Sequence, residues 1–264
     1  MKRFFKFVVL FAVVINVAFL CGCSTVPFTE RSRFLMTGEQ TENNLGREAW
    51  QKMLAEEKIS DNRKQNEALL RIGHNISEVA GKPTYNWEFR VFDNTQANAF
   101  CLPGGKVGVT TALFDFTAND AELATVVGHE IGHAIARHGG ERMSHGMLQQ
   151  LGMKAVSYGT QEPMFVSAFG LLSNVGAILP YSRVHEYEAD HIGLILMAKA
   201  GYDPSAAISF WKKFGKDGND QRLLELLSTH PMSKKRWEEM DALQKKAREY
   251  YEKAPKKHGF GEKL

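Results

Sequence analysis

The sequence predicts an α+β protein that is mostly helical and contains one small mixed β-sheet. Residues 39–80 carry apolar side chains at helical spacing, residues 85–114 switch to the alternation typical of strands, and helical patterns then return. With 264 residues and 44% hydrophobic composition, the chain can bury one core of enzyme size. We therefore expect a single folded domain over residues 39–253, followed by a flexible tail at 254–264.

The N-terminal leader is typical of an exported protein. Residues 1–22 hold a basic start, an apolar run from Phe7 to Leu20, and small residues before a cysteine. The end of the leader resembles a bacterial lipobox, with Leu20 three positions and Gly22 one position before Cys23. Cys23 would then be lipidated and become the mature N-terminus. An uncleaved anchor helix is the alternative, which the short apolar run disfavours.

The expected location follows from this leader. Ser24 resembles the sorting signal of outer-membrane lipoproteins, so we expect a lipid-anchored protein of the bacterial outer membrane that faces the periplasm, with residues 23–38 as a tether. The several acyl chains of such a cysteine anchor a protein firmly. Once Cys23 is acylated, Cys101 is the only other cysteine, which excludes an intramolecular disulfide framework. The net charge of +3 comes from the leader, and nothing indicates a nucleic-acid partner.

The next predictions concern the helices that follow the predicted sheet. Asn119 can cap a helix, Glu122 three residues later completes a variant of the capping box, and Gly139–Gly140 would end this helix. The apolar segment 164–179 is short for a membrane span and holds Ser and Asn, so we expect a buried or interfacial helix there. The other helices that we expect lie at residues 141–158, 181–200 and 233–253.

The stretch "HEIGH" inside the capped helix predicts a metal site. His129 and His133 are four residues apart, so their imidazoles project from one helix face and can bind one zinc ion. Glu130 flanks that face, where it can take a proton from a zinc-bound water. A coincidental surface pattern is the alternative.

A catalytic zinc site needs a third protein ligand. The metzincin pattern fails, because its glycine and histidine positions hold Ala136 and Gly139, and His138 is one residue out of register. A later stretch, "HEYEAD", offers Glu186 as third ligand and Asp190 one turn further on, which would hydrogen-bond a ligand histidine. A solvated helical face is the alternative for this pair.

Four separated motifs, "NAFCLPGG", "HEIGH", "EYEAD" and "STHP", together resemble the zinc metallopeptidase family typified by the CAAX prenyl protease. The resemblance covers residues from about 70 to 240, and the chain is similar to the short periplasmic lipoproteins of that family. It implies a gluzincin-type fold, in which a small mixed sheet lies over the active-site helix and the helix of Glu186 packs beside it. It also implies one Zn²⁺ per chain.

The resemblance further implies residues that act on substrate. His230 in "STHP" would either donate to the oxyanion of the transition state or act as a fourth ligand that keeps the enzyme latent. A surface histidine is the remaining alternative. The strand after Gly105 would be the sheet edge to which an extended peptide adds, with an internal strand as the alternative. This predicted edge strand comprises Lys106, Val107, Gly108 and Val109.

The sequence thus predicts a zinc endopeptidase in which His129, His133 and Glu186 hold the metal and Glu130 is the general base. Its place and binding mode suggest unfolded or misassembled envelope proteins as substrates, and the envelope assembly machinery as a candidate partner. The alternative is a latent or non-catalytic zinc-stabilised periplasmic chaperone or scaffold, with a closed site that includes His230. Cys101 lies where alanine is common in the family, so it is given no role, and no spacing assigns a functional role to His74, His138, His145 or Tyr187.

Overall fold

A computed structural model describes residues 23–156, 183–216, 220–231 and 233–264. Its elements, in chain order, are β1 (Cys23–Thr25), β2 (Ser32–Phe34), α2 (Glu39–Glu56), α3 (Arg63–Val79), β3 (Glu88–Phe92), β4 (Ala99–Leu102), β5 (Lys106–Thr110), η1 (Thr111–Asp115), α4 (Asp120–Ile135), α5 (His138–Val156), α7 (Arg183–Lys199), α8 (Ser205–Lys216), η2 (Gln221–Leu223), α9 (Leu224–Thr229) and α10 (Lys234–Lys253). The predicted class, mostly helical with a small mixed sheet, is confirmed. The helix predicted over 164–179 lies outside the described residues.

The main sheet has the strand order β3-β5-β4, so β5 is its central strand. Val107 pairs with Phe89 of β3 in parallel and with Cys101 of β4 in antiparallel register. The tight turn through Gly104 and Gly105, both at φ 83°, returns the chain from β4 into β5, and β3 then pairs with the other side of β5. The prediction is therefore wrong that the sheet edge consists of Lys106, Val107, Gly108 and Val109.

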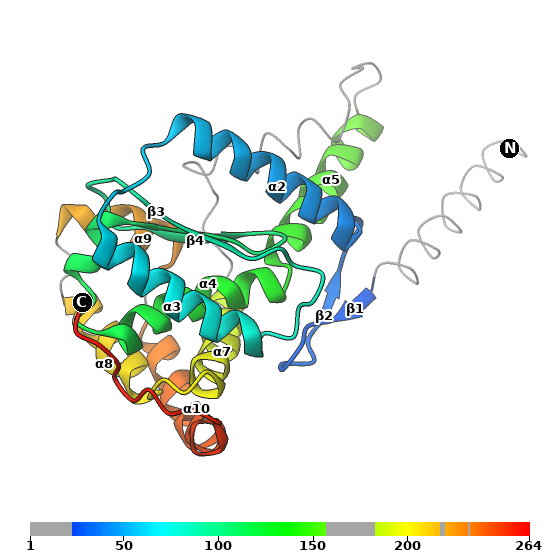
Figure 1. The fold of residues 1–264 in the computed structure, drawn as a ribbon. Coiled ribbons are helices and arrows are strands. Elements are labelled where there is room, and N and C mark those ends of the chain that lie inside the picture. The colour runs from blue at the N-terminus through cyan, green and yellow to red at the C-terminus, as the bar shows by residue number, and fades with distance from the viewer. Residues whose placement is uncertain (1–22, 157–182, 217–219, 232) are drawn as a thin grey trace, which may run out of the picture.

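Helix α4 lies at the centre of the fold, between the sheet and α7 (Figure 1). Asn119 caps it as predicted, since its side chain accepts a hydrogen bond from the Glu122 N–H at 3.1 Å. Every residue of the helix from Asp120 to Ile135 is buried, because β4 and β5 contact it together with α3, α7 and α8. The polar side chains of α4 are therefore enclosed by protein on several sides.

Close contact between α4 and α7 depends on small residues. A Cβ on Gly193 would lie 2.7 Å from the backbone nitrogen of His129, and a Cβ on Gly132 would lie 2.8 Å from the carbonyl oxygen of Ala189. Side chains at these two positions would push the helix backbones apart. Glycine therefore allows the first turn of α7, which carries Glu186, to approach the histidine-bearing face of α4.

Residues 23–38, predicted to be a tether, form a β-hairpin and a link that pack on the helices. Arg33 is buried and donates a hydrogen bond to the carbonyl of Ala136, just after α4. The Met36 N–H donates to the Ser144 hydroxyl of α5 at 2.8 Å. The tether prediction is wrong for this segment, because its polar groups find partners on α4 and α5 that its own sequence does not reveal.

Residues 254–264, predicted to be a flexible tail, cross the start of α4 instead. The carbonyls of Phe260 and Glu262 accept hydrogen bonds from the N–H groups of Ala121 and Asp120, at 3.1 and 2.9 Å. The first N–H groups of a helix have no partner inside it. The tail prediction is wrong because this polar segment supplies acceptors that the buried end of α4 requires.

Two helix boundaries also differ from the predictions. The helical region predicted at 39–80 consists of α2 and α3, separated by a short stretch in which Ile59 pairs with β3. Gly139 and Gly140, predicted to end the helix of the metal motif, lie inside α5. The chain leaves α4 before them, at Arg137, which has a left-handed φ of 53°. Among the helices that the structure describes, none combines the length and the apolar character needed to cross a membrane.

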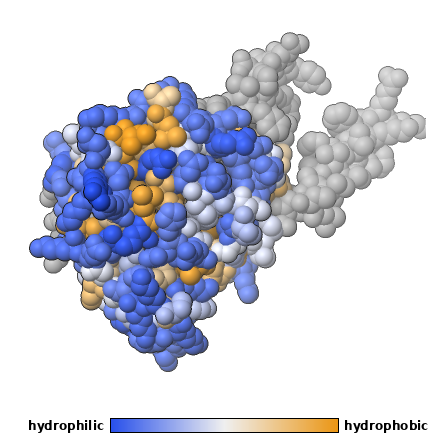
Figure 2. All heavy atoms as spheres, in the orientation of Figure 1, coloured by the Kyte–Doolittle hydropathy of each residue, from blue (hydrophilic) through white to orange (hydrophobic). Residues whose placement is uncertain are grey.

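The hydrophobic core surrounds α4 and has a small satellite. The main cluster joins residues of α3, α4, α7, α8 and the sheet, whereas the satellite packs Trp50 of α2 against Phe92 and Leu102. Figure 2 shows a mostly hydrophilic face with an apolar area near the end of α2 and the neighbouring strands. The polar motif of α4 therefore lies within the main core and not on the surface.

The packing of the C-terminal segment predicts different effects of alanine at two left-handed glycines. At Gly81 (φ 66°) an added Cβ meets no atom within 4 Å, so Gly81→Ala should cost about 1–2 kcal/mol for its backbone conformation alone. At Gly201 (φ 86°) the Cβ would also overlap the carbonyl oxygen of Lys256, so Gly201→Ala should cost about 2–5 kcal/mol. Urea unfolding of both variants measures the difference. Equal losses would show that the C-terminal segment does not pack against Gly201.

Candidate metal centre

Helix α4 presents the predicted motif on its buried face. The Nε2 atoms of His129 and His133 lie 3.1 Å apart, and each side chain is 2% exposed. Residues four apart on a helix are neighbours on one face, which explains why both rings reach the same point. The coincidental surface pattern is therefore excluded for these two histidines.

Glu186 reaches the same point from the first turn of α7. Its Oε2 lies 3.5 Å from His129 Nε2, and its Oε1 lies 3.4 Å from His133 Nε2. The Glu186 side chain is 1% exposed, so this part of α7 is not a solvated face. The structure thus brings together the three residues that the sequence predicts as metal ligands.

His230 joins these residues from the loop between α9 and α10. Its Nδ1 lies 3.2 Å from His129 Nε2 and 3.2 Å from Glu186 Oε2, and its Nε2 lies 3.4 Å from Oε1 of Glu130. The residue is 3% exposed, which excludes the surface alternative. Its ring therefore faces both the metal ligands and the predicted general base.

The donor atoms fit one zinc ion. One donor atom from each of His129, His133, Glu186 and His230 lies within 4.8 Å of all the others. Four ligands at 2.0–2.1 Å from a tetrahedral zinc are about 3.3 Å apart. The separations among the donors of this cluster, 3.1 to 3.5 Å, agree with that value. Imidazole nitrogen and carboxylate oxygen are also donors that zinc accepts.

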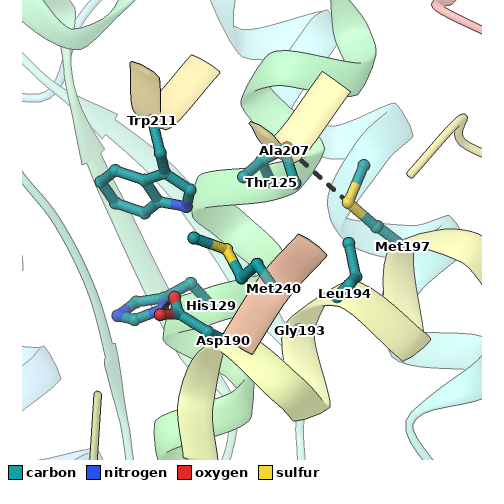
Figure 3. A pocket seen from close by; sticks show the side chains of 9 residues that line it. All are labelled: Thr125, His129, Asp190, Gly193, Leu194, Met197, Ala207, Trp211 and Met240. Atoms are coloured by element: carbon teal, nitrogen blue, oxygen red, sulfur yellow. Dashed lines mark hydrogen bonds and ion pairs between the residues drawn. The ribbon is translucent and has the colours of Figure 1, made fainter. Parts of the chain in front are cut away.

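Asp190 lies one turn further along α7 and contacts His129. Its Oδ1 is 2.8 Å from Nδ1 of His129, the position that the sequence prediction requires. Arg236 of α10 donates to both Asp190 oxygens at 2.7 and 2.8 Å and lies 3.0 Å from Glu186. Figure 3 shows the His129 ring and the Asp190 carboxylate side by side, with the Trp211 indole nearby. This side of the site is therefore closed by packed side chains.

The electrostatics of the site favour a bound cation. Burial alone would lower the pKa of His129, but the hydrogen bond and charge of Asp190 raise it to about 9. Burial likewise favours the neutral form of Glu186, yet His230, His129 and His133 hold the pKa of this carboxyl well below its ordinary value. Burial raises the pKa of Glu130, which makes its carboxylate a stronger base.

Strand β4 packs more extensively than β5 against α4, the helix that carries the predicted base. Burial and the negative charge of Glu130 raise the pKa of the Cys101 thiol of this strand well above its usual value. Lys106 of β5 instead forms an ion pair with Glu88 of β3 at 2.8 Å. The residues predicted as the substrate edge are therefore internal to the sheet.

Sequence reasoning missed three residues around the ligands. Arg236 neutralises buried carboxylates, His138 Nδ1 lies 2.7 Å from His133 Nδ1, and Glu188 Oε2 lies 2.9 Å from His138 Nε2. Glu188 is two residues from Glu186, a spacing that places it on a different side of the helix. That side is also buried, which no sequence pattern indicates. The one signal for His138 was its position shortly after the motif.

This fold and this site define the class of the protein as a zinc metallopeptidase. The model of the family described as "Peptidase family M48" matches residues 63–244, and the chain belongs to this family. The resemblance inferred from the four sequence motifs is thereby confirmed.

Curated relatives carry protease names. "Mitochondrial metalloendopeptidase OMA1" of Arabidopsis thaliana is 38% identical over 201 residues, which are 76% of this chain and 39% of that protein. The protein of the same name from Schizosaccharomyces pombe is 32% identical over 219 residues, 80% of this chain and 63% of the relative. "Beta-barrel assembly-enhancing protease" of Escherichia coli is 28% identical over 174 residues, 62% of this chain and 36% of the relative. The chain thus spans 36 to 63% of the length of these three relatives.

Proposed function

We propose that this chain is a zinc endopeptidase in which His129, His133 and Glu186 hold one Zn²⁺ and Glu130 is the general base. The observation that carries the proposal is the set of donor atoms from two helices at tetrahedral spacing, with a buried carboxylate next to them. Bound zinc would lower the pKa of a coordinated water toward neutrality and polarise a peptide carbonyl.

Glu130 is suited to move the proton in this reaction. It is 2% exposed, and the nearest charged or ionisable partner that the structure describes for its Oε1 is Nε2 of His230 at 3.4 Å, beyond a well-formed hydrogen bond. Its raised pKa, caused mainly by burial, strengthens it as a base. Glu130 would accept a proton from the attacking water and transfer it to the amine that leaves.

The open edge of β4 is a place where an extended peptide can bind. Among the described strands, none pairs with the outer side of β4. The Thr110 N–H donates to the Asn98 carbonyl at 3.0 Å, and hydrogen-bonded pairs alternate along an antiparallel ladder, so the backbone groups of Ala99 and Cys101 point away from β5. The Ala99 N–H donates to Oδ1 of Asn98 at 2.8 Å, so a peptide would pair with the Ala99 carbonyl and with the backbone of Cys101. Because β4 packs against α4, the helix that carries His129, Glu130 and His133, a peptide added to this edge would run along the helix of the metal site.

Backbone pairing to β4 requires an extended substrate and selects little for side chains. We therefore propose unfolded or misassembled envelope proteins as substrates and the envelope assembly machinery as a partner. The printed name of the Escherichia coli relative, which refers to β-barrel assembly, is consistent with this class.

The Glu130→Gln substitution tests the reaction. The zinc-loaded variant should retain about one zinc per chain but lose turnover by about 10²–10⁴-fold, because the amide cannot accept the proton. His129→Ala, the control, should lose the metal as well. Cleavage of the unfolded and folded forms of one outer-membrane protein, followed by gel electrophoresis, measures both activity and substrate class. Normal turnover by Glu130→Gln would contradict the mechanism, and equal cleavage of both forms would contradict the substrate class.

We also propose that Cys23 is lipidated and holds the enzyme at the outer membrane, facing the periplasm, after removal of residues 1–22. The support is the apolar leader that ends in the lipobox-like "LCGC". The relatives of higher identity are named as mitochondrial, whereas a mitochondrial targeting segment is amphipathic and rich in Arg and Ser. The leader of this chain is apolar, which favours the bacterial envelope.

Metabolic labelling with a palmitate analogue in a Gram-negative host tests the anchor. The full chain should be labelled and should fractionate with the outer membrane, because the thiol of Cys23 is the acceptor. Cys23→Ser should abolish both properties, whereas the control Cys101→Ser should keep them. If Cys23→Ser remained labelled or bound to the membrane, the lipid anchor at this position would be excluded.

A latent state is the second candidate, and the position of His230 favours it. Its Nδ1 lies 3.2 Å from the donor atoms of His129 and Glu186, as a fourth zinc ligand would, and a tetrahedral zinc with these four ligands would have no position for water or substrate. In a purely structural version of this state, the chain would be a zinc-stabilised chaperone or scaffold. That version gives no role to the buried base Glu130.

His230→Ala distinguishes the two roles of this histidine. If the ring closes the site, its removal should raise cleavage of the unfolded substrate several-fold and weaken zinc binding, and we expect this result. The surface variant His145→Ala is the control and should change neither quantity. A large loss of turnover with unchanged zinc affinity would instead identify His230 as the donor to the oxyanion.

A further inference from the structure

His129 and His133 of α4 point Nε2 at the metal site, and their other ring nitrogens, Nδ1, contact different partners. His129 Nδ1 faces the Asp190 carboxylate at 2.8 Å, whereas His133 Nδ1 faces another imidazole, Nδ1 of His138, at 2.7 Å. Nε2 of His138 in turn lies 2.9 Å from Oε2 of Glu188. A chain of hydrogen bonds thus leads from His133 through His138 to a carboxylate.

The proton positions in this chain follow from its far end. Arg31 forms an ion pair with Glu188 and donates to its Oε2 at 2.8 and 3.0 Å, and Thr29 donates to the other oxygen, so this carboxylate is an acceptor. Nε2 of His138 lies 2.9 Å from the same Oε2 and therefore donates to it, which places the one proton of the neutral His138 ring on Nε2. Nδ1 of His138 is then an acceptor, and His133 must donate from its own Nδ1.

This arrangement places the ring lone pair of His133 on Nε2, the atom that faces the other donors. A histidine ligand requires this tautomer. His138 therefore does for His133 what Asp190 does for His129.

The fold holds His138 firmly in place. Arg137, directly before it, has a left-handed φ of 53°, and its guanidinium is fixed by Glu42 at 2.7 and 2.9 Å and by the Thr37 carbonyl at 2.8 Å. The His138 ring is fully buried and stacks on His185 with 4.2 Å between ring centroids. A strained residue persists where surrounding contacts determine its conformation, and here this turn aims His138 at the motif.

The N-terminal hairpin holds the other end of the chain. Arg31 donates to Glu188 at 2.8 and 3.0 Å and binds Glu141 in a bidentate pair at 2.7 and 2.8 Å. Thr29 also donates to Glu188, and the two residues beside it, Phe28 and Glu30, have left-handed φ values of 70° and 56°. The loop that carries Thr29 and Arg31 thus follows Cys23 by a few residues and contacts the carboxylate on which the His138 tautomer depends.

We propose that His138 is a positioning residue for the metal ligand His133, with Glu188 setting its tautomer and Arg31 of the hairpin holding Glu188. The inference rests on the proposed zinc site. Its consequence is that zinc affinity depends on a segment that lies next to the anchor cysteine in the sequence and is remote from the metal-binding motif.

Two substitutions of His138 test this chain of hydrogen bonds from His133 through His138 to Glu188, called the relay below. The Oδ1 of asparagine occupies about the place of Nδ1 and can accept from His133, whereas glutamine places its amide nitrogen near Nε2 and offers no acceptor at the Nδ1 position. His138→Asn should therefore keep zinc affinity within a few-fold of the unsubstituted protein, and His138→Gln should lose about 10–100-fold. Competition with a chromogenic chelator measures the affinity.

A purely structural role predicts the opposite order, because glutamine retains the contact to Glu188 and asparagine does not. Urea unfolding of the metal-free proteins gives the separate stability readout. Equal zinc affinities of the two variants, or tighter binding by His138→Gln, would overturn the relay. If the unsubstituted protein bound no zinc, the proposed function would fail together with the relay.

A second pair of variants tests the carboxylate end of the relay, Glu188, without altering His138. Glu188→Leu and Glu141→Leu each remove one carboxylate partner of Arg31, but only Glu188 contacts His138. Glu188→Leu should weaken zinc binding by about 10-fold or more, and Glu141→Leu, the matched control, should leave it nearly unchanged. An equal effect of both substitutions would show that hairpin docking, and not the tautomer of His138, controls the site.

Discussion

The metal site depends on the close approach of the α4 and α7 backbones. Glycine at 132 faces the carbonyl of Ala189, and Gly193 faces the backbone of His129, so neither contact tolerates a methyl group without a shift. Metal–ligand distances tolerate deviations of about 0.2 Å. A shift of several tenths of an ångström between the helices would therefore separate Glu186 from the histidines. This explains why small residues are interleaved with the ligands in both motifs.

The close packing of α4 and α7 also buries several carboxylates in the core, and a neighbouring arginine neutralises part of their charge. Glu186 and Asp190 are shielded by Arg236, which is 1% exposed and also lies over the Trp211 ring. Buried ions of one sign are costly unless they are paired. Even with Arg236 present, the carboxylates raise the pKa of His129, so the cluster without its metal still attracts positive charge. Metal binding and the stability of this region are therefore coupled.

The sequence predicts those features that depend on local spacing. The cap at Asn119 and the shared face of His129 and His133 follow from helix periodicity alone, and both were predicted. The strand order, the docked C-terminal segment and the partner of His133 depend on contacts between residues far apart in the chain. Composition describes 254–264 as a polar tail, because it cannot reveal that the first N–H groups of α4 need acceptors there. His138 was misjudged for the same reason, since its role depends on Glu188, 50 residues away.

The latent state proposed above requires the loop that carries His230 to move while the three ligands on α4 and α7 stay in place. Arg236 connects the two parts, because it donates to the Pro231 carbonyl at 3.2 Å and to both oxygens of Asp190 at 2.7 and 2.8 Å. The charged pair with Asp190 is buried and has two hydrogen bonds, whereas the contact to the loop is a single hydrogen bond to a neutral carbonyl. Displacement of the loop would break this weaker contact together with the contacts of His230 with His129 and Glu186, and would leave Arg236 on Asp190. In this proposal, the closed and open forms share the ligands on α4 and α7 and differ at the fourth position.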